Sequence, residues 1–477
     1  MSIPLTAPAS VLVRLVNSGD LSASDLVQAH LDRISALDPA IGAFVDLRAD
    51  QAIAEARAQD EAASHGTPRG PLGGLPVTVK SAIEVAGLRC ETGSPFRAGV
   101  MATGDAVVVH RLKEAGAIVI GTTNVAEMLM GYETDNPLHG RTVNPWDPTR
   151  TPGGSSGGES AAIAAGLSGG GIGSDGGGSI RVPAHFTGIC GLKPTPGRIP
   201  ATGHQPACLG PFSLIGVVGP MARTVGDLQA LFAVLAGWDD ADPMAVPLAV
   251  RTEPGRHRHL RIGWFEDDGR VPVTPETRAA VRAAALGVER AGFEVKPFFP
   301  PALSKARALW DVFFCETGAL LLSETHGGAE SALPILEAFE GTRPSREPFT
   351  ARRLAHAWID RDLVRAELLS QMATHRVLVC PVAAVPAFRH GERAWTIDGA
   401  EVRYLDAMIY TQWFNVLGNP AVVVPVGRSP EGLPIGVQVV GRPFEEELVL
   451  EVAAAIEREC GGYVAPPLTS RHHVPPR

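Results

Sequence analysis

The feature that most constrains this chain is the stretch from Thr151 to Ser179, TPGGSSGGESAAIAAGLSGGGIGSDGGGS, which is about two-fifths glycine. Glycine loses more backbone entropy on folding than any other residue, so this density indicates backbone that adopts strained conformations or closely approaches a ligand. A serine pair lies near one end, and Ser179 follows three glycines at the other. Unhindered N–H groups can converge on one point and stabilise a developing oxyanion. The stretch therefore predicts a nucleophile and an oxyanion hole in one turn.

A serine nucleophile needs a base, because its hydroxyl is unreactive at neutral pH. Only five of the 42 Lys and Arg residues are lysine, and Lys80 ends the segment LPVTVK, whose apolar and polar residues alternate as on a β-strand. Such a strand would deliver Lys80 to a sheet end beside apolar residues, where desolvation favours the neutral amine that can accept a proton. Lys193 is the rival base, but Pro194 follows it at once.

Four strings in this order and spacing resemble the amidase signature family of Ser-Ser-Lys hydrolases: LPVTVK, GGSSGGE (153–159), GSDGGGSIRVPA (173–184) and GICGLKPT (188–195). Further similarity lies in GTTNVAEM, NPLHGRTVNPW, GPMART and FNVLGNPAVVVPVG. The resemblance covers almost the whole chain. It implies that Ser179 attacks an amide carbonyl and forms an acyl-enzyme, that Ser155, held by a cis peptide bond in the family, relays the proton, and that Lys80 is the final base.

The resemblance also assigns the residues around this triad. The backbone amides of the expected oxyanion hole belong to Gly176, Gly177, Gly178 and Ser179. Three further residues, Ser156, Asp175 and Arg181, are expected to support the loop rather than take part in the chemistry.

Two positions depart from the family pattern. Gly176 stands where Thr or Ile is common, which keeps the N–H donor and loosens the turn. Ser81 stands where many members have Asp, which removes a carboxylate from the surroundings of Lys80.

Other interpretations of the glycine-rich stretch fit less well. Residues 171–176 satisfy the dinucleotide pattern GxGxxG, but no strand is expected before them and no acidic residue follows about 20 positions later. Residues 154–158 satisfy the nucleophile-elbow pattern GxSxG with Ser156 as nucleophile, but three prolines just before them exclude a buried strand. Ser179 as a simple helix cap and the glycines as a linker are the remaining alternatives.

Composition excludes several function classes. A net charge of −9 without a basic cluster argues against nucleic-acid binding. The six cysteines are far apart without a CxxC pair, so neither a zinc site nor a disulfide framework is indicated, and no metal or cofactor is expected. The N-terminus lacks the pattern of a signal peptide and no stretch reaches 18 apolar residues, so we expect a cytoplasmic protein without an integral membrane segment.

Helix and strand patterns alternate along the chain, which predicts an α/β fold. A helix from Ser22 to Leu37 opens with the capping pair Ser22 and Asp25, a strand is expected at 117–120, and two C-terminal strands precede a helix from Glu445 to Glu457. The resemblance implies a single large domain, 1–477, with a mixed central β-sheet covered by helices on both sides. Its signature core would span about 73–225, and the variable segment of about 230–375 is where we expect the substrate pocket.

The predicted activity is hydrolysis of the C–N bond of a linear, small-molecule carboxamide. NPLHGRTVNPW, SSGGE and GICGLKPT are more similar to the fatty acid amide hydrolase branch than to short-chain amidases, which leaves the acyl group open. The alternative is the glutaminase chain of a tRNA-dependent amidotransferase, although Val182 and Pro196 replace the Gln and Tyr usual in that branch. A homodimer is also left open.

Overall fold

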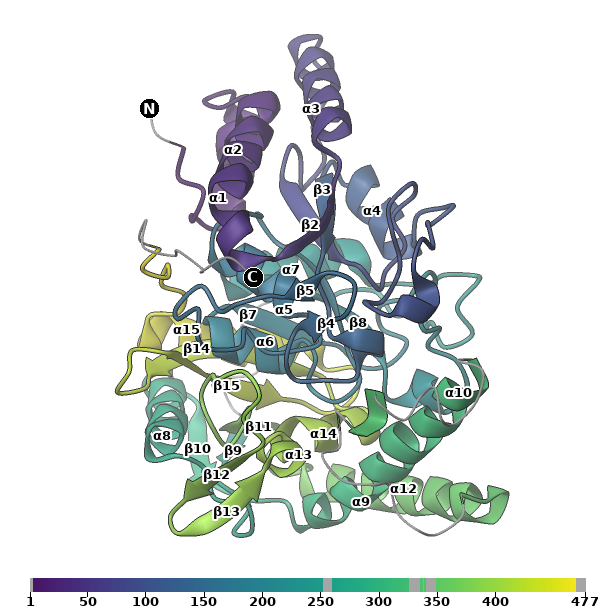
Figure 1. Ribbon diagram of the computed structural model, residues 1–477. Helices are drawn as coiled ribbons and strands as arrows, with labels where there is room; N and C mark the ends of the chain where they lie inside the picture. Colours follow the sequence, from purple (N-terminus) through teal and green to yellow (C-terminus); the bar gives the residue numbers. More distant parts are fainter. Residues whose placement is uncertain (1–2, 252–259, 326–334, 338, 340–348, 469–477) are drawn as a thin grey trace.

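An 11-stranded sheet runs through the centre of the computed structural model (Figure 1), which describes residues 3–251, 260–325, 335–337, 339 and 349–468. In spatial order its strands are β1 (Phe44–Leu47), β3 (Ile118–Thr123), β2 (Pro76–Lys80), β6 (Gly171–Asp175), β8 (Val217–Ala222), β7 (Cys190–Lys193), β14 (Ala421–Arg428), β15 (Pro434–Val440), β11 (Val377–Pro381), β9 (Arg261–Trp264) and β10 (Glu294–Pro297). The neighbours β3, β2 and β6 are parallel, as are β11, β9 and β10, and the other pairs are antiparallel. The sheet is mixed, as predicted.

In the described part of the chain, helices precede, separate and follow these strands. They are α1 (Ala9–Ser18), α2 (Ala23–Ile41), α3 (Ala49–Ser64), α4 (Val107–Glu114), α5 (Gly157–Ala164), α6 (Arg181–Thr187), α7 (Val225–Leu235), α8 (Pro275–Arg290), α9 (Ala306–Trp310), a π-helical turn η5 (Asp311–Glu316), α10 (Thr317–Thr325), α12 (Ala351–Gln371), α13 (Tyr404–Ala407), α14 (Ile409–Val416) and α15 (Glu446–Cys460). Two small hairpins, β4 (Asp135–Asn136) with β5 (Gly140–Arg141) and β12 (Ala394–Ile397) with β13 (Ala400–Arg403), lie outside the main sheet.

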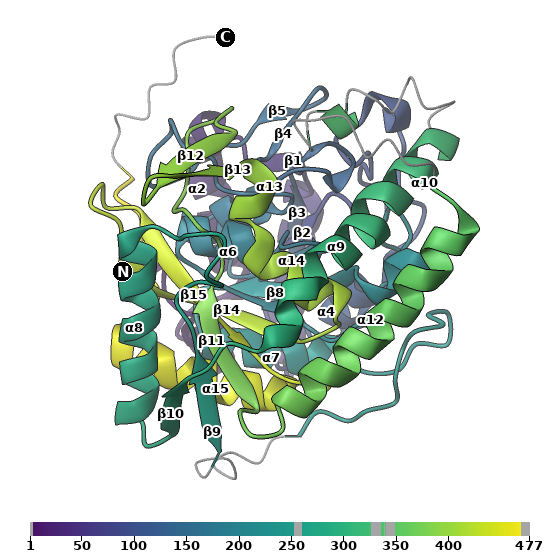
Figure 2. The same ribbon diagram turned by 90° about the horizontal axis from the view of Figure 1, so that it is seen from below.

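Alternation along β14 shows that the sheet separates two cores. Val422 and Val424 pack into a cluster with α7, α8 and α15, whereas Val423 between them packs into a second cluster with α6 and α14. Successive side chains of a strand point to opposite faces, so helices cover both sides of the sheet, which confirms the predicted arrangement. Figure 2 shows α10 and α12 along one edge of the molecule and α8 at the other.

The local signals for individual elements are confirmed with small shifts at their ends. The oxygen Oγ of Ser22 accepts a hydrogen bond of 2.9 Å from the backbone N–H of Asp25, so Ser22 caps α2 as predicted. The helix continues to Ile41, beyond the expected Leu37, and ends where Gly42 adopts a φ of 69°. The strand expected at 117–120 is β3, and the last helix is α15.

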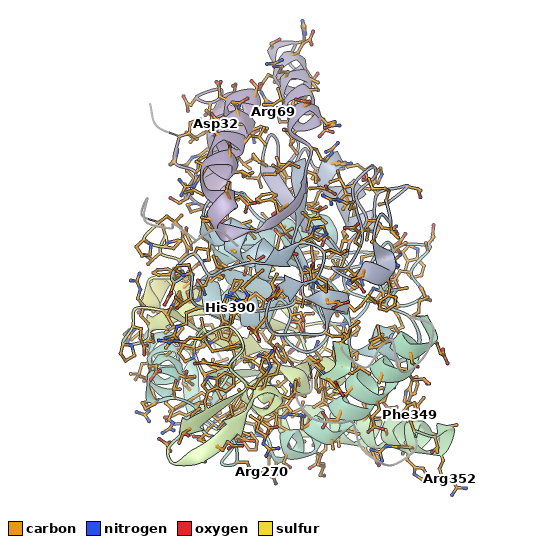
Figure 3. The ribbon with its side chains drawn as sticks, viewed as in Figure 1. Asp32, Arg69, Arg270, Phe349, Arg352 and His390 are labelled. Atoms are coloured by element: carbon orange, nitrogen blue, oxygen red, sulfur yellow. The ribbon has the colours of Figure 1, made fainter. Side chains whose placement is uncertain are left out.

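Charged side chains lie mainly at the periphery. Asp32, Arg270 and Arg352 are exposed at three separate edges of the molecule (Figure 3). In the part of the chain that the structure describes, no helix combines the length and the apolar character needed to cross a membrane. The cytoplasmic location stays a prediction.

Candidate active site

Strand β2 ends at Lys80 between β3 and β6, and all five of its residues are buried. The Lys80 side chain has no solvent exposure. Its nitrogen Nζ lies 2.7 Å from Oγ of Ser155 and 3.0 Å from Oγ of Ser174. The strand therefore brings Lys80, the predicted base, into contact with Ser155, the predicted proton relay.

Burial sets the charge state of Lys80. Desolvation lowers the pKa of the amine to about 7, against the attraction of the Asp175 carboxylate, which favours the charged form. A neutral amine is thus well populated at neutral pH. It has one lone pair, which can accept the Ser155 proton, and two N–H groups, one of which can donate to Ser174.

The serine pair lies in the turn that leads into α5. The peptide bond between Gly154 and Ser155 is cis, as the resemblance implied. Both serines are fully buried. The backbone N–H of Ser156 donates to the carbonyl of Ser179 (3.2 Å), and its hydroxyl donates to the carbonyl of Ser174 (3.3 Å). Ser156 therefore ties the two glycine-rich turns together, in line with the supporting role predicted for it.

Ser179 lies in the short turn between β6 and α6. It is 8% exposed, whereas Lys80 and Ser155 have no exposure. Ser155 and Ser179 line the same cavity. The structure thus brings Lys80, Ser155 and Ser179 to one place from three separate segments, with Ser179 nearest to solvent.

The carbonyl groups of this turn are held by side chains from distant segments. The carbonyl of Asp175 accepts from the amide nitrogen of Asn415 (3.1 Å), and the carbonyl of Gly176 accepts from the indole N–H of Trp310 (3.1 Å). In a trans peptide the N–H points away from the C=O, so these anchors fix the amides of Gly176 and Gly177 on the opposite side. The carbonyl of Gly178 is fixed in the same way by a bond of 2.7 Å from the N–H of Val182 in α6.

One member of the predicted oxyanion hole is already engaged. The N–H of Gly178 donates to Oδ1 of Asp175 (2.7 Å), because the carbonyl of Gly177 is turned towards the hydroxyls of Tyr132 (2.9 Å) and Thr411 (2.7 Å). A backbone N–H has a single proton, so Gly178 is committed to Asp175 in this structure, and its role in the oxyanion hole stays a prediction. Within the described residues, the amides of Gly176, Gly177 and Ser179 donate no hydrogen bond and remain the candidate donors.

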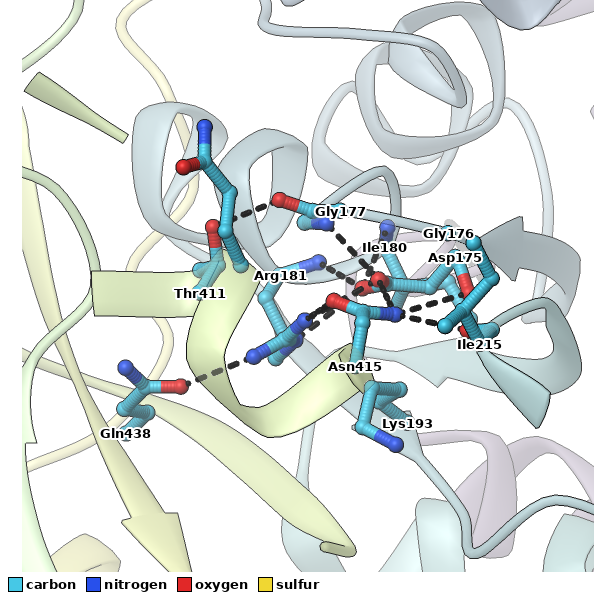
Figure 4. Close-up of polar contacts among 12 residues, drawn as sticks. Asp175, Gly176, Gly177, Ile180, Arg181, Lys193, Ile215, Thr411, Asn415 and Gln438 are labelled. Carbon is cyan, nitrogen blue, oxygen red and sulfur yellow. Dashed lines mark hydrogen bonds and ion pairs between the residues drawn. The ribbon is translucent and has the colours of Figure 1, made fainter. Parts of the chain in front are cut away.

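Asp175 and Arg181 both contact the turn, and the supporting role that the resemblance gave them stays a prediction. Arg181 forms an ion pair with Asp175 at 3.0 Å, with both side chains fully buried (Figure 4). The same guanidinium donates to Gln438 of β15 (3.1 Å) and to Asn415 of α14. Burial alone would raise the pKa of the Asp175 carboxyl, but Arg181 and the hydrogen bonds outweigh it and hold that pKa well below its usual range. The carboxylate is therefore charged at neutral pH and can hold the Gly178 amide.

The cavity at this site is mostly apolar. Its lining residues are Met128, Leu129, Met130, Ser155, Ser174, Asp175, Gly176, Ser179, His204, Pro206, Ala207, Cys208, Phe212, Gly216, Val217 and Phe314. Segments 128–130 and 204–217 supply most of the residues beyond the glycine-rich turns. From the variable segment 230–375, Phe314 lines it among the described residues. The prediction that this segment forms the pocket stays a prediction, since parts of it lie outside the described residues.

Lys193 is also fully buried, and burial lowers the pKa of its amine to about 7. Its nitrogen Nζ donates to the carbonyl of Pro194 (2.9 Å), and Lys193 does not line the cavity. A low pKa alone therefore does not decide which lysine is the candidate base. Contact with Ser155 favours Lys80.

Comparison with known proteins bears on what this arrangement is. The Amidase family model matches residues 25–450. The chain belongs to the amidase family. This membership makes the protein an amidohydrolase and agrees with its mixed sheet.

Similar proteins span almost the full length of this amidase. An indoleacetamide hydrolase of Bradyrhizobium diazoefficiens is 36% identical over 94% of this chain and 85% of its own. One component of a glutamyl-tRNA(Gln) amidotransferase from Synechococcus sp. (strain CC9605) is 33% identical over 95% of this chain and 96% of its own. A solved structure described as an unexpected vestigial protein complex that reveals the origins of an s-triazine catabolic enzyme superposes with a TM-score of 0.85, with 31% identity over 96% of this chain and 100% of that chain.

Sequence reasoning missed the side chains that orient the turn of this amidase. Asn415 lies inside the string FNVLGNPAVVVPVG, so its place in a matching motif was an available signal. Tyr132, Trp310 and Thr411 lie in strings that matched no motif, and their contacts with the turn span 45, 134 and 234 residues. In the described part of the chain, no group of His, Cys, Asp and Glu residues is arranged to hold a metal ion.

Proposed function

We propose that this protein hydrolyses a carboxamide C–N bond through an acyl-enzyme on Ser179, with Ser155 as proton relay and Lys80 as base. The single observation that carries the proposal is the 2.7 Å contact between Nζ of Lys80 and Oγ of Ser155 beside a cavity that Ser179 shares. A buried amine with a pKa of about 7 is suited to accept a proton and return it within one turnover.

In the first half of the reaction, Oγ of Ser179 attacks the carbonyl carbon. The Ser179 proton passes to Ser155 as the Ser155 proton passes to Nζ of Lys80. The amides of Gly176, Gly177 and Ser179 receive the negative charge that develops on the carbonyl oxygen. When the C–N bond breaks, the same proton returns from Lys80 through Ser155 to the leaving nitrogen, which departs as ammonia or an amine.

In the second half, water attacks the ester carbonyl. Its proton takes the same route to Lys80, and Ser179 recovers that proton when the C–O bond breaks. The product is a carboxylate, and all three residues return to their starting state. No group besides the chain and water is needed to balance these steps.

The lining of the cavity favours an acyl group with apolar or aromatic character. Met128, Leu129, Met130, Phe212 and Phe314 offer thioether, aliphatic and aromatic contacts. A relative is named for the hydrolysis of indoleacetamide. We therefore propose primary arylacetamides as the first substrates to test.

The test is covalent labelling combined with turnover. A fluorophosphonate should label the purified protein at Ser179, identified by peptide mapping, and a panel of carboxamides from acetamide to arylacetamides should be hydrolysed with release of ammonia. Labelling at another serine, or labelling without turnover of any amide in the panel, would contradict the proposal.

The glutaminase alternative predicts a different result. The glutaminase chain of an amidotransferase would copurify with a second protein in equal amounts and would release ammonia from glutamine to amidate a charged tRNA. Turnover of arylacetamides by the isolated chain, with no response to glutamine or tRNA, favours the hydrolase.

A further inference from the structure

His204 lies in the cavity but takes no part in the proposed proton path. Its backbone segment pairs with the segment that follows Lys80: the N–H of Gln205 donates to the carbonyl of Ala82 (2.7 Å), and the N–H of Glu84 donates to the carbonyl of Gly203 (2.9 Å). These bonds fix the imidazole beside the end of β2. His204 lines the cavity together with Ser155 and Ser179.

The contacts of the ring determine its tautomer. Nδ1 of His204 lies 2.8 Å from the carbonyl oxygen of Pro206. A carbonyl oxygen can only accept a hydrogen bond, so Nδ1 carries the proton. Burial is the main cause that lowers the pKa of the ring to about 4, so the imidazole is neutral at pH 7. Nε2 is therefore a bare lone pair that can only accept.

This acceptor is buried without a partner. His204 is 6% exposed, and among the described residues no donor lies within hydrogen-bond distance of Nε2. Most of the surrounding lining is apolar, including Met130, Phe212 and Phe314. A buried polar atom without a partner is costly, and at a residue that lines a cavity a ligand can supply the missing hydrogen bond.

We propose that Nε2 of His204 accepts a hydrogen bond from an N–H or O–H group of the substrate and so selects for substrates that carry such a donor. This inference rests on the proposed amide hydrolysis and adds a specificity residue to it. The donor has two sources with the same chemistry: the N–H of the scissile amide, or an N–H or O–H group on the acyl group.

Two variants distinguish a role of Nε2 as acceptor from a role of Nδ1 in holding the Pro206 carbonyl. In His204→Asn the side-chain amide can still donate to the Pro206 carbonyl from the place of Nδ1, but the acceptor at the place of Nε2 is lost. In His204→Gln the longer side chain can place its oxygen near the former Nε2. A role confined to holding Pro206 would be better preserved by Asn than by Gln, whereas an acceptor role would be better preserved by Gln.

Two pairs of substrates identify the donor. The first pair is a carboxamide and the methyl ester of the same acid, which differ in the scissile N–H. The second pair is 3-indolylacetamide and its N-methyl indole analogue, which differ in the donor on the acyl group. The readout is kcat/KM for the donor-bearing member divided by kcat/KM for the other member of the pair. A loss of activity that affects both members equally leaves this ratio unchanged.

In one of the two pairs, His204→Asn should lower the ratio of kcat/KM for the donor-bearing member to kcat/KM for the other member by roughly 5- to 100-fold relative to the wild type. His204→Gln should restore part of it. A change in the amide-to-ester ratio identifies the scissile N–H, and a change in the second ratio identifies a donor on the acyl group. If His204→Asn leaves both ratios as in the wild type, the inference is overturned while amide hydrolysis stands. If the wild type neither hydrolyses an amide nor reacts with a fluorophosphonate at Ser179, the proposed function itself fails.

Discussion

The ring of Phe314 occupies the space that a side chain at Gly176 would need. A Cβ atom added at position 176 would lie 2.8 Å from Cε2 of Phe314, closer than carbon atoms approach without displacement. Phe314 in turn stacks on Trp310, with ring centroids 4.8 Å apart and planes 11° from parallel. The glycine that departs from the family pattern is thus matched to an aromatic pair that covers the turn, and the looser backbone expected from the sequence is supported by packing.

This contact predicts a compensating pair of substitutions. Gly176→Ala should lower kcat by about 10-fold, because the turn must shift to relieve the clash and its amides then miss the oxyanion. Gly176→Ala combined with Phe314→Leu should recover most of that loss. The control is Phe314→Leu alone, assayed on the smallest amide that is turned over. Equal activity of Gly176→Ala and the wild type would show that the ring yields without moving the turn.

The pH dependence of activity should follow Lys80. Its amine must be neutral to act as a base, so kcat/KM should fall as the pH drops through about 7, up to tenfold per pH unit below it. Lys193 has a pKa of about 7 as well and provides the matched control. Lys193→Met should keep the acidic limb of the profile where it is, whereas Lys80→Met should abolish turnover at every pH. If the acidic limb moves in Lys193→Met, the group that titrates near pH 7 in the activity profile is Lys193 and not Lys80.

The same burial predicts an effect of Lys80 on stability. The folded-state pKa of Lys80 lies near 7 and that of a free lysine near 10.5, so between these pH values the unfolded chain binds more protons. The free energy of unfolding should therefore rise with pH across this window. Lys80→Met removes this titrating amine. At pH 7 its free energy of unfolding should therefore exceed that of the wild type by about 3–5 kcal/mol. Urea unfolding of both proteins at pH 7 and pH 9.5 tests this, because the difference between their free energies of unfolding should be smaller at the higher pH.

Replacing Ser179 and replacing Ser155 should have different effects on turnover and on fluorophosphonate labelling. Ser179→Ala should lower kcat by on the order of 10⁴ or more and lose the fluorophosphonate adduct, because the attacking atom is gone. Ser155→Ala should retain the labelling site but react far more slowly, because the path to Lys80 is interrupted. Ser156→Ala is the control for the serine pair and keeps its backbone bond to Ser179. A Ser155→Ala protein that labels at the wild-type rate would exclude Ser155 as the relay.

Trp310 should act through the turn it anchors. Trp310→Phe keeps an aromatic ring against Phe314 but loses the N–H that holds the Gly176 carbonyl. The peptide unit that carries the Gly177 amide is then free to rotate, and kcat should fall by about 10-fold with little change in KM. Trp358→Phe, at an exposed position, serves as the control. A rise in KM at unchanged kcat would instead place Trp310 in substrate binding.

Local patterns in the sequence located several parts of this site. The alternation in LPVTVK predicted β2, the capping pair at Ser22 predicted α2, and the glycine density around Ser179 predicted the turn. These signals work because strand period, helix caps and glycine flexibility depend on residues that are neighbours in the chain. The same neighbours carried the family resemblance and hence the candidate triad.

The sequence by itself thus determined several of the helices and strands and, through its resemblance to a family, the candidates for chemistry and the mixed character of the sheet. Only the tertiary structure decided which lysine meets Ser155, that Asp175 takes the Gly178 amide, and that Phe314 requires glycine at 176. It also decided that His204 lines the cavity and that its Nε2 has no partner among the described residues. The physical reason is that a pKa and the partner of a hydrogen-bond donor depend on burial and on the groups packed around it. Those groups come from segments as far as 257 residues away, as with Gln438 and Arg181, and no local pattern specifies them.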